Sequence, residues 1–309
     1  DSSSQQFLLS QAYLDGINQY IDEGKTPIEF RLLGVEKEHY TIKDIYNVFG
    51  YMAFSFAQAH KTDPLLTDLR DALGTEYLLE LDIDISSKST LIRNSRGMKR
   101  MATNFGARIN NIMDNLPVPP FVGSNSWVIG PQKSKNGKVI FANDPHIEFS
   151  QPSVWYQAHL ITPGREMYGF YLALSPFAVL GHNHDYAYGI TMLENDDTDF
   201  FYEDPDQKYI VKEETIRIKG GEDLRFQVKT GAHGPVISKV PKGMALEPNI
   251  SMDWIYLKEP SDLLKVTYQI SHAASLYDFR DAVTGIKAPG LSMMYGDAKG
   301  NIAWFGAAQ

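Results

Sequence analysis

The apolar residues of this chain follow a helical spacing before residue 116 and a strand-like alternation after residue 123. Between the two patterns lies the sequence LPVPP, residues 116–120, whose prolines cannot join a helix and favour an extended surface segment. A chain that places helices first and mostly antiparallel strands afterwards favours an α+β fold over an alternating α/β fold. The change of pattern therefore predicts an α+β protein.

The first part of the chain is predicted to be helical. Phe7, Leu14 and Ile21 share one face of a helix that Gly24 ends. Further helices are expected after an N-cap at Thr41 and through Phe56, over residues 65–73 after Asp63-Pro64, and over residues 97–115.

Short alternating segments separated by Gly, Asn, Asp and Pro predict strands in the second part. One helix, over residues 275–283, is expected to interrupt them. The predicted strands cover residues 126–129, 138–142, 154–161, 167–174, 186–191, 215–218, 224–230 and 264–270, and a last strand is expected within residues 301–309.

The composition excludes several classes of protein. The absence of cysteine rules out disulfides, thiol nucleophiles and Cys-based zinc sites. A net charge of -9 without a Lys/Arg cluster disfavours nucleic acid and anionic membranes as partners. No apolar run approaches the roughly 20 residues that a membrane span requires, so no membrane partner is expected.

Common catalytic motifs are also absent. The sequence has no glycine-rich phosphate loop, no His-Glu-x-x-His helix and no Gly-x-Ser-x-Gly elbow. His182 and His184 would share one face of a strand and could suit a metal, but a hydrogen-bonded loop pair beside Asn183 and Asp185 is the favoured interpretation.

One segment, GSNSWVIG at residues 123–130, places a serine between the proline-rich segment and a strand. Taken alone, this serine could be a turn residue. Other short motifs follow it in a fixed order: ANDPH (142–146), PSVWY (152–156), GHN (181–183), YGIT (188–191), four residues at 196–199, HGPV (233–236), APGL (288–291) and DAKGNI (297–302). AYLDGIN (12–18) and PIEF (27–30) precede it. In this order the motifs resemble the penicillin acylase family of N-terminal-nucleophile hydrolases.

The resemblance implies a fold and a division of the chain. Members of the family form an αββα four-layer sandwich, and a precursor cleaves itself at a Gly-Ser bond, here Gly123-Ser124. Residues 1–115 would then be a helical α-chain portion, residues 116–123 the end of a proline-rich linker, and residues 124–309 the first part of the β-chain. The start lacks the basic and apolar regions of a signal peptide, and we expect the chain to be truncated at both ends.

The resemblance also implies the catalytic residues. Ser124 would be the nucleophile, with its own freed α-amine as the base, acting through a bridging water. The Met192 N–H falls at the position of the backbone oxyanion donor, whereas the second donor of the family, an Asn side chain, would lie beyond Gln309. His146 stands where long-chain and homoserine-lactone acylases carry the His that orients the serine; its alternative is a structural loop histidine.

A structural calcium ion is the one cofactor that the resemblance implies, and no catalytic cofactor is expected. Asp196, Thr198 and Asp199 align with calcium ligands of the family, and carboxylates with a carbonyl are the donors that Ca²⁺ takes. The family's α-chain Glu ligand is missing, because Ala59 or a close neighbour stands there. Solvated turn residues are the alternative.

The acyl pocket is assigned by position to Ile147 and Leu180. Two aliphatic side chains would suit a fatty or aryl acyl group. Plain core packing is the equal alternative for both residues.

The sequence therefore predicts an amide hydrolase that acts on small acyl amides. N-acyl homoserine lactones or aliphatic amides are favoured over a penicillin side chain, from His146 and the HGPV motif. The expected partner is the rest of the precursor, in an α/β heterodimer, and the resemblance implies a periplasmic location. The alternatives are a non-catalytic, unprocessed binding protein of the same fold and a carbohydrate-binding protein that uses Trp155, Tyr156, Trp254 and Tyr256.

Overall fold

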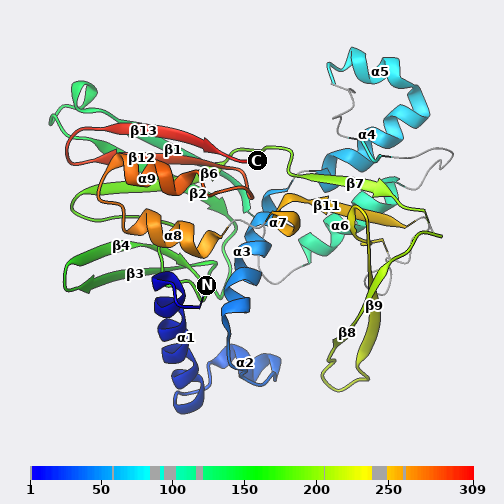
Figure 1. Cartoon of the computed structure of the whole chain (residues 1–309), viewed down its shortest axis with the longest axis horizontal. Helices are drawn as coiled ribbons and strands as arrows, with labels where there is room; N and C mark the ends of the chain where they lie inside the picture. The colour runs from blue at the N-terminus through cyan, green and yellow to red at the C-terminus, as the bar shows by residue number, and fades with distance from the viewer. Residues whose placement is uncertain are drawn as a thin grey trace. The chain divides into compact units, whose positions relative to one another are not determined.

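The computed structural model describes residues 2–57, 59–83, 91–93, 102–115, 121–204, 206–238, 249–259 and 262–309. They form two compact units (Figure 1). Unit 1 contains residues 1–56, 118–195 and 260–309, and unit 2 contains residues 57–117 and 196–259. Each unit therefore combines segments from both sides of the expected Gly123-Ser124 junction. The expected division into α-chain and β-chain concerns cleavage of the chain and stays a prediction.

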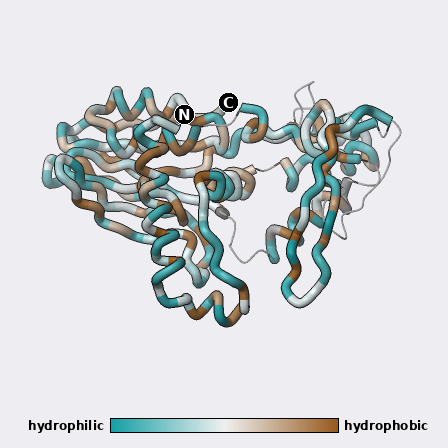
Figure 2. Tube along the Cα trace, turned by 60° about the horizontal axis from the view of Figure 1, so that its bottom comes forward, coloured by the Kyte–Doolittle hydropathy of each residue, from teal (hydrophilic) through white to brown (hydrophobic). Residues whose placement is uncertain are grey.

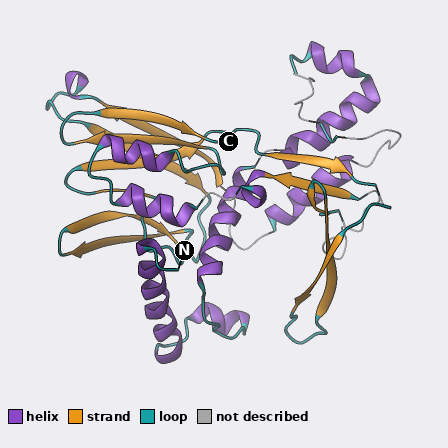
Figure 3. Cartoon of the chain, in the orientation of Figure 1, coloured by secondary structure: helices purple, strands orange, loops and turns teal. Residues whose placement is uncertain are grey.

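Helices occupy the described part of the chain before residue 116, and strands dominate after it (Figure 3). This confirms the predicted α+β class. The helices of the first part are α1 (Gln5–Glu23), α2 (Ile28–Leu33), α3 (Ile42–Phe56), α4 (Ala59–Leu73), α5 (Thr75–Glu80) and α6 (Ala102–Asp114). Residues 97–101 and the proline-rich residues 116–120 lie outside the described residues.

Two predicted helix boundaries have a clear physical basis. Gly24 follows α1 and donates its N–H to the Tyr20 carbonyl, so the predicted end of this helix is confirmed. Thr41 precedes α3, and both its N–H and its hydroxyl donate to the Asp44 carboxylate, each at 2.8 Å. The acidic side chain in the first turn thus satisfies groups that the helix itself leaves without a partner.

Helix α4 differs from the prediction. It begins at Ala59, so Pro64 lies inside the helix and not at its start. A proline inside a helix cannot donate to the carbonyl four residues earlier. Here His60, Asp63, Pro64 and Thr67 are all buried, and the Pro64 ring lies against Gly106 of α6. Burial of this face outweighs the lost hydrogen bond.

Unit 1 is built on two antiparallel sheets. The larger sheet has the order β13-β12-β6-β5-β4-β3, and β1 pairs with β2 in a separate hairpin. The strands are β1 (Phe121–Ile129), β2 (Ile140–Ile147), β3 (Trp155–Thr162), β4 (Arg165–Leu172), β5 (Leu180–His182), β6 (Tyr186–Met192), β12 (Leu291–Asp297) and β13 (Ile302–Ala307). A short 3-10 turn, η1 (Pro131–Lys133), follows β1.

Alternate residues of β6 face two different layers. Tyr188 is buried and lies against Phe279 of α9 (Leu276–Val283), with ring centroids 5.9 Å apart. Its neighbour Gly189 faces the β1-β2 hairpin, where a Cβ atom would lie only 2.3 Å from Asn143 Oδ1. Unit 1 therefore stacks a helical layer, the large sheet and the hairpin, and the absence of a side chain at Gly189 lets the hairpin approach closely.

The predicted strand over residues 264–270 is wrong, because this segment is helix α8 (Leu263–Ser271). Asp262 caps the helix by accepting a hydrogen bond from the Lys265 N–H, at 3.2 Å. The Thr267 hydroxyl donates to the Leu263 carbonyl one turn earlier, at 2.7 Å. The buried residues of this segment, Ile270 among them, recur at helical spacing. Their burial outweighs the preference of β-branched residues for a strand.

Unit 2 contains two small antiparallel sheets, β11-β7 and β10-β9-β8. Hydrophobic and hydrophilic residues succeed one another along the long β8-β9 hairpin (Figure 2), as expected for strands with two different faces. The strands are β7 (Thr198–Tyr202), β8 (Ile210–Ile216), β9 (Leu224–Gly231), β10 (Gly234–Pro235) and β11 (Ile250–Trp254), which runs into the short helix α7 (Ile255–Lys258).

A membrane-spanning helix requires both length and a continuous apolar surface. Among the helices of the described segments, none meets both conditions.

Candidate active site

Ser124 lies inside β1, directly after a β-bulge. The pairing of β1 with β2 shifts between Phe121 and Gly123, so that Val122 is an additional residue on this strand. A bulge bends a strand and redirects the side chains next to it. The peptide bond at which self-cleavage is expected therefore follows an irregular step of the hairpin.

Met192, the last residue of β6, lies next to this serine. Its backbone N–H donates a hydrogen bond to Ser124 Oγ, at 3.3 Å. A carbonyl group attacked by Oγ would place its oxygen within reach of donors near Oγ, and stabilising that oxygen is the role of an oxyanion donor. The structure thus brings together the predicted nucleophile and the predicted backbone donor, while their chemical roles stay predictions.

His146 lies across the hairpin from Gly123. Its Nδ1 would be 3.7 Å from a Cβ atom on Gly123, and its Nε2 lies 3.1 Å from Asp144 Oδ2 and 3.2 Å from Asn125 Nδ2. One ring nitrogen cannot donate to the carboxylate and accept from the amide at the same time, so the two contacts require different tautomers. The imidazole is therefore beside the expected cleavage site, with Nδ1 on the Gly123 side.

The two predicted pocket residues lie in the same unit. Ile147 ends β2, and Leu180 begins β5 with only 7% of its surface exposed. Cavities of about 600 and about 380 Å³ lie at the other end of β6, around Asp185 and Asp297, and neither is lined by the two residues. The assignment of Ile147 and Leu180 to an acyl pocket stays a prediction.

The predicted calcium ligands lie in unit 2, near a carboxylate that the sequence had not indicated. Asp63 of α4 is 1% exposed. Burial raises the pKa of Asp63 to about 7, and the negative charges of Asp196 and Asp199 add to this effect. Burial also raises the pKa values of Asp196 and Asp199, which the positive charge of Arg93 opposes.

These groups only partly suit a calcium ion. Carboxylate and carbonyl oxygens are the donors that Ca²⁺ takes. However, among the residues that the structure describes, no three His, Asp or Glu side chains are grouped so that they could hold a metal ion. Arg93 instead forms an ion pair with Asp199, at 2.9 Å. Calcium binding at this place would require Arg93 to release Asp199, and Asp196, Thr198 and Asp199 stay predicted ligands.

The histidine pair of the β5-β6 turn has ordinary partners. The Asn183 side chain accepts hydrogen bonds from the N–H groups of Asp185 and Tyr186, at 2.8 and 2.9 Å. His184 Nε2 lies 2.8 Å from the Glu166 carboxylate. The favoured interpretation, a hydrogen-bonded loop pair beside Asn183 and Asp185, is confirmed for His184.

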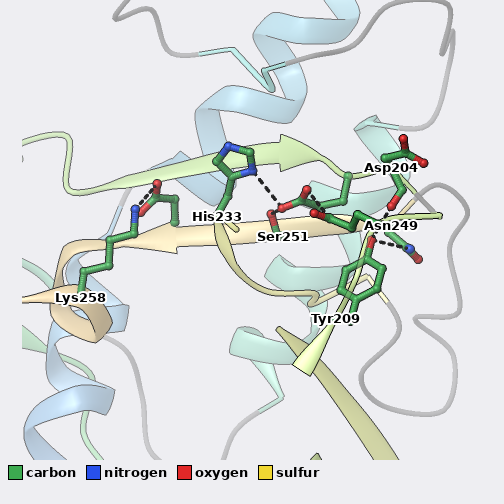
Figure 4. Close-up of polar contacts among 9 residues, drawn as sticks. Asp204, Tyr209, His233, Asn249, Ser251 and Lys258 are labelled. Atoms are coloured by element: carbon green, nitrogen blue, oxygen red, sulfur yellow. Dashed lines mark hydrogen bonds and ion pairs between the residues drawn. The ribbon is translucent and has the colours of Figure 1, made fainter. Parts of the chain in front are cut away.

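A second polar cluster in unit 2 surrounds Glu203, at the end of β7. The carboxylate is 4% exposed and lies within hydrogen-bonding distance of Ser251 Oγ (2.6 Å), Gln207 Nε2 (2.5 Å) and His233 Nδ1 (3.0 Å). Figure 4 shows His233 and Ser251 directed at the same carboxylate. Burial by itself raises the pKa of Glu203, but these hydrogen bonds outweigh it and hold the pKa below its ordinary value.

The His233 ring has a second contact, which explains the HGPV motif in structural terms. It stacks on Phe201, with ring centroids 3.9 Å apart and planes 3° apart. The hydroxyl of Ser251 donates to the Glu203 carboxylate, whose lowered pKa makes it a weak base for activating a nucleophile. The cluster is therefore a buried anchor between β7, β11 and the β9-β10 turn.

Comparison with known proteins places the chain in a family. The family model described as penicillin amidase matches residues 2–309. The chain belongs to the penicillin amidase family. It is 24% identical to the acyl-homoserine lactone acylase QuiP of Pseudomonas aeruginosa over 95% of its own length and 38% of that protein. Penicillin acylase 2 proenzyme of Pseudomonas sp. strain SE83 is 25% identical over 94% of this chain and 40% of its own length.

A solved structure supports the same fold. The thermostable penicillin G acylase from Alcaligenes faecalis aligns with a TM-score of 0.52 and 19% identity, over 60% of this chain and 35% of that one. The penicillin amidase fold is thus shared, whereas the relatives are more than twice as long as the matched region. The activity of the whole protein accordingly remains a proposal.

Proposed function

We propose that this chain belongs to a hydrolase that cleaves linear carboxamides, with Ser124 as nucleophile after self-cleavage of the Gly123-Ser124 bond. The observation that carries the proposal is the 3.3 Å hydrogen bond from the Met192 N–H to Ser124 Oγ. It pairs the two groups that acyl transfer needs, and they come from different sheets and are 68 positions apart in the chain. Membership of the penicillin amidase family supports the same reaction class.

Self-cleavage would generate the catalytic base. Ser124 Oγ attacks the Gly123 carbonyl carbon, the peptide C–N bond breaks, and the nitrogen takes up a proton to become a free amine. Water then hydrolyses the resulting ester, which leaves a carboxylate on Gly123 and restores the Ser124 hydroxyl. Before this step the Ser124 nitrogen is an amide and cannot act as a base, so the uncleaved chain is inactive.

Turnover uses the same atoms. The freed α-amine, with a reference pKa of about 7.7–8.0, accepts the Oγ proton through a water molecule. Oγ attacks the substrate carbonyl, and the Met192 N–H stabilises the negative oxygen, an interaction that contributes about 10²–10³-fold in comparable enzymes. The leaving nitrogen takes up the proton, and water hydrolyses the acyl-serine ester. His146, beside Gly123, orients the amine and the hydroxyl.

Finer features of the proposal rest on the family resemblance. Within linear amides, we favour N-acyl homoserine lactones or aliphatic amides over a penicillin side chain, because of His146 and residues 233–236. The layers of unit 1 are compatible with part of an αββα four-layer sandwich. A periplasmic location, an α/β heterodimer with the rest of the precursor and a structural Ca²⁺ complete the proposal.

The test begins with mass spectrometry of the full-length protein. We expect two fragments, the second beginning at Ser124, and hydrolysis of a panel of fluorogenic acyl amides. Ser124→Ala should abolish cleavage and hydrolysis and leave the circular-dichroism spectrum unchanged. Hydrolysis at the wild-type rate in this variant would overturn the proposal, and turnover of phenylacetyl amides alone would contradict the aliphatic preference.

The same experiment separates the remaining alternatives. A wild-type chain that stays intact indefinitely would favour a non-catalytic binding protein of the same fold. The carbohydrate-binding alternative is less compatible with the structure, because Trp254 is only 6% exposed and its ring is stacked on Tyr256.

A further inference from the structure

The side chain of Asn143 connects the β1-β2 hairpin to the large sheet of unit 1. Its Nδ2 donates to the Asn125 carbonyl of β1 and to the Ile190 carbonyl of β6, both at 3.0 Å. Its Oδ1 accepts from the Ile190 N–H, also at 3.0 Å. Both Nδ2 hydrogens and the side-chain oxygen are therefore used, and all three bonds go to backbone groups.

The Asn143 amide bonds to a part of β6 that is not paired with β5. The pairing of β5 with β6 consists of Gly181 with Tyr188 and His182 with Ala187, so the backbone of Ile190 lies beyond that ladder. The Asn143 amide takes the N–H and the carbonyl of Ile190 in the way that a neighbouring strand would. Gly189 makes this possible, because a Cβ atom there would lie 2.3 Å from Asn143 Oδ1.

The two anchoring points flank the candidate reacting groups. Asn125 directly follows the nucleophile Ser124, and Ile190 precedes Met192 by two residues on the same strand. Fixing Asn125 against Ile190 therefore fixes Ser124 Oγ against the Met192 N–H, which lie 3.3 Å apart. The Asn143 side chain binds the backbones of both β1 and β6, whereas the Ser124 side chain contacts the backbone of β6.

We propose that Asn143 is a positioning residue that sets the distance between the nucleophile and the oxyanion donor. The inference rests on the proposed function and concerns the same site. Asn143 acts through the backbones of two strands. A displacement of about 1 Å at reacting groups can cost on the order of 10²-fold in rate, so a single amide at this junction has a large effect on turnover.

Two variants separate positioning from bulk stability. Asn143→Ala removes all three hydrogen bonds. Asn143→Asp keeps the shape and the acceptor for the Ile190 N–H but places an oxygen against the carbonyls of Asn125 and Ile190. Ser126→Ala is the matched control, because Ser126 lies opposite Asn143 in the hairpin and its hydroxyl donates only to the Ala142 carbonyl, at 3.1 Å.

The experiment measures self-cleavage, kcat and KM of the full-length protein with a fluorogenic acyl amide, together with the thermal unfolding midpoint. We expect both Asn143 variants to lower kcat and the cleavage rate by about 10²-fold, with KM changed less than about threefold. Ser126→Ala should keep wild-type values of all these quantities.

The outcomes distinguish this inference from the proposed function. If Ser124→Ala is inactive but a folded Asn143→Asp retains wild-type kcat, the positioning role is wrong and the proposed function stands. Failure of both Asn143 variants to fold also overturns the inference, because it assigns the amide to sheet packing alone. If Ser124→Ala retains activity, the proposed function itself fails.

Discussion

The buried negative charge of the unit 2 aspartates can be balanced in two ways, by the Arg93 guanidinium or by a bound cation. Asp63, Asp196 and Asp199 all have pKa values raised by burial, and Asp63 is raised further by its two neighbours. Arg93 balances part of this charge through its 2.9 Å ion pair with Asp199. A calcium ion would do the same through direct coordination, so the guanidinium and the cation compete for Asp199.

This competition predicts the response to calcium. Adding Ca²⁺ to full-length protein prepared in chelator should raise the thermal unfolding midpoint, because a ligand that binds only the folded state stabilises it by about 2.7 kcal/mol at 100 times its Kd. Asp196→Asn should abolish the increase, and Arg93→Gln should enlarge it. Asp223→Asn, in the β8-β9 turn, should leave it unchanged.

Calorimetry with Ca²⁺ and with Mg²⁺ measures these differences. If neither the wild type nor Arg93→Gln responds to millimolar Ca²⁺, the proposed ligands Asp196, Thr198 and Asp199 are wrong. Arg93 alone would then be the counter-charge of the cluster.

At the scale of single residues, the sequence could indicate Ser124 and His146, which lie in motifs of recognisable order, and Met192, which directly follows the YGIT motif. It assigned no role to Asn143, although this residue lies in the ANDPH motif, or to Asp63. The importance of Asn143 depends on how two sheets approach each other at Gly189. Asp63 lies one helical turn after Ala59, which stands where the family resemblance implies a Glu ligand, and the Asp63-Pro64 pair made it resemble the start of a helix.

At the scale of elements, the anchor around Glu203 connects β7, β11 and the β9-β10 turn. A buried carboxylate is stable only if hydrogen bonds replace the water that it loses. Ser251 supplies one of them from β11, and His233 supplies another from the residue before β10. These bonds therefore stabilise the packing of three elements as well as one charge.

The lowered pKa of Glu203 makes this anchor sensitive to acid. A carboxyl whose pKa is lower in the folded state contributes stability that is present above its ordinary value of 4.5 and is lost as the pH falls through the folded-state value. Ser251→Ala removes one hydrogen bond to the charge, and we expect it to lower the free energy of unfolding by about 1.5–3 kcal/mol at pH 7. The difference from wild type should shrink below pH 4.5.

Urea unfolding at pH 7 and at pH 3.5 tests this expectation. Ser55→Ala is the matched control, because Ser55 is also buried but donates to the neutral Met52 carbonyl, at 2.8 Å. Its effect should be the same at both pH values. An equal effect of Ser251→Ala at both pH values would show that Glu203 does not carry the pH dependence.

Helix α8 shows where element prediction from sequence fails. Residues 264–270 were predicted as a strand, yet the decisive features are the Asp262 cap and a buried face that follows helical spacing. Of the large sheet, β3, β4, β6 and β13 overlap predicted strands, whereas β5 and β12 were not predicted. The helical conformation of α8 depends on a buried surface that exists only after unit 1 has formed.

At the scale of the whole molecule, both compact units cross the expected cleavage point. In unit 1, the Tyr13 hydroxyl of α1 lies 2.6 Å from the Tyr156 hydroxyl of β3, and Tyr46 of α3 donates to Asp262 before α8, at 3.0 Å. In unit 2, the backbone N–H of Arg93 donates to the Phe200 carbonyl at 3.0 Å, and the backbone N–H of Tyr202 donates to the Arg93 carbonyl at 3.1 Å. Cleavage at Gly123-Ser124 breaks neither set of contacts.

This interleaving predicts that the two products of self-cleavage stay associated. The fragment that ends at Gly123 and the fragment that begins at Ser124 should elute together in size-exclusion chromatography under native conditions, with no separate peak on dilution. They should separate only in urea, at the concentration that unfolds the protein, because each unit buries its core with residues of both fragments. Ser124→Ala should elute at the same volume and stay one chain in urea. Separate elution of the first fragment under native conditions would mean that the units do not hold the fragments together, and the proposed heterodimer would be wrong.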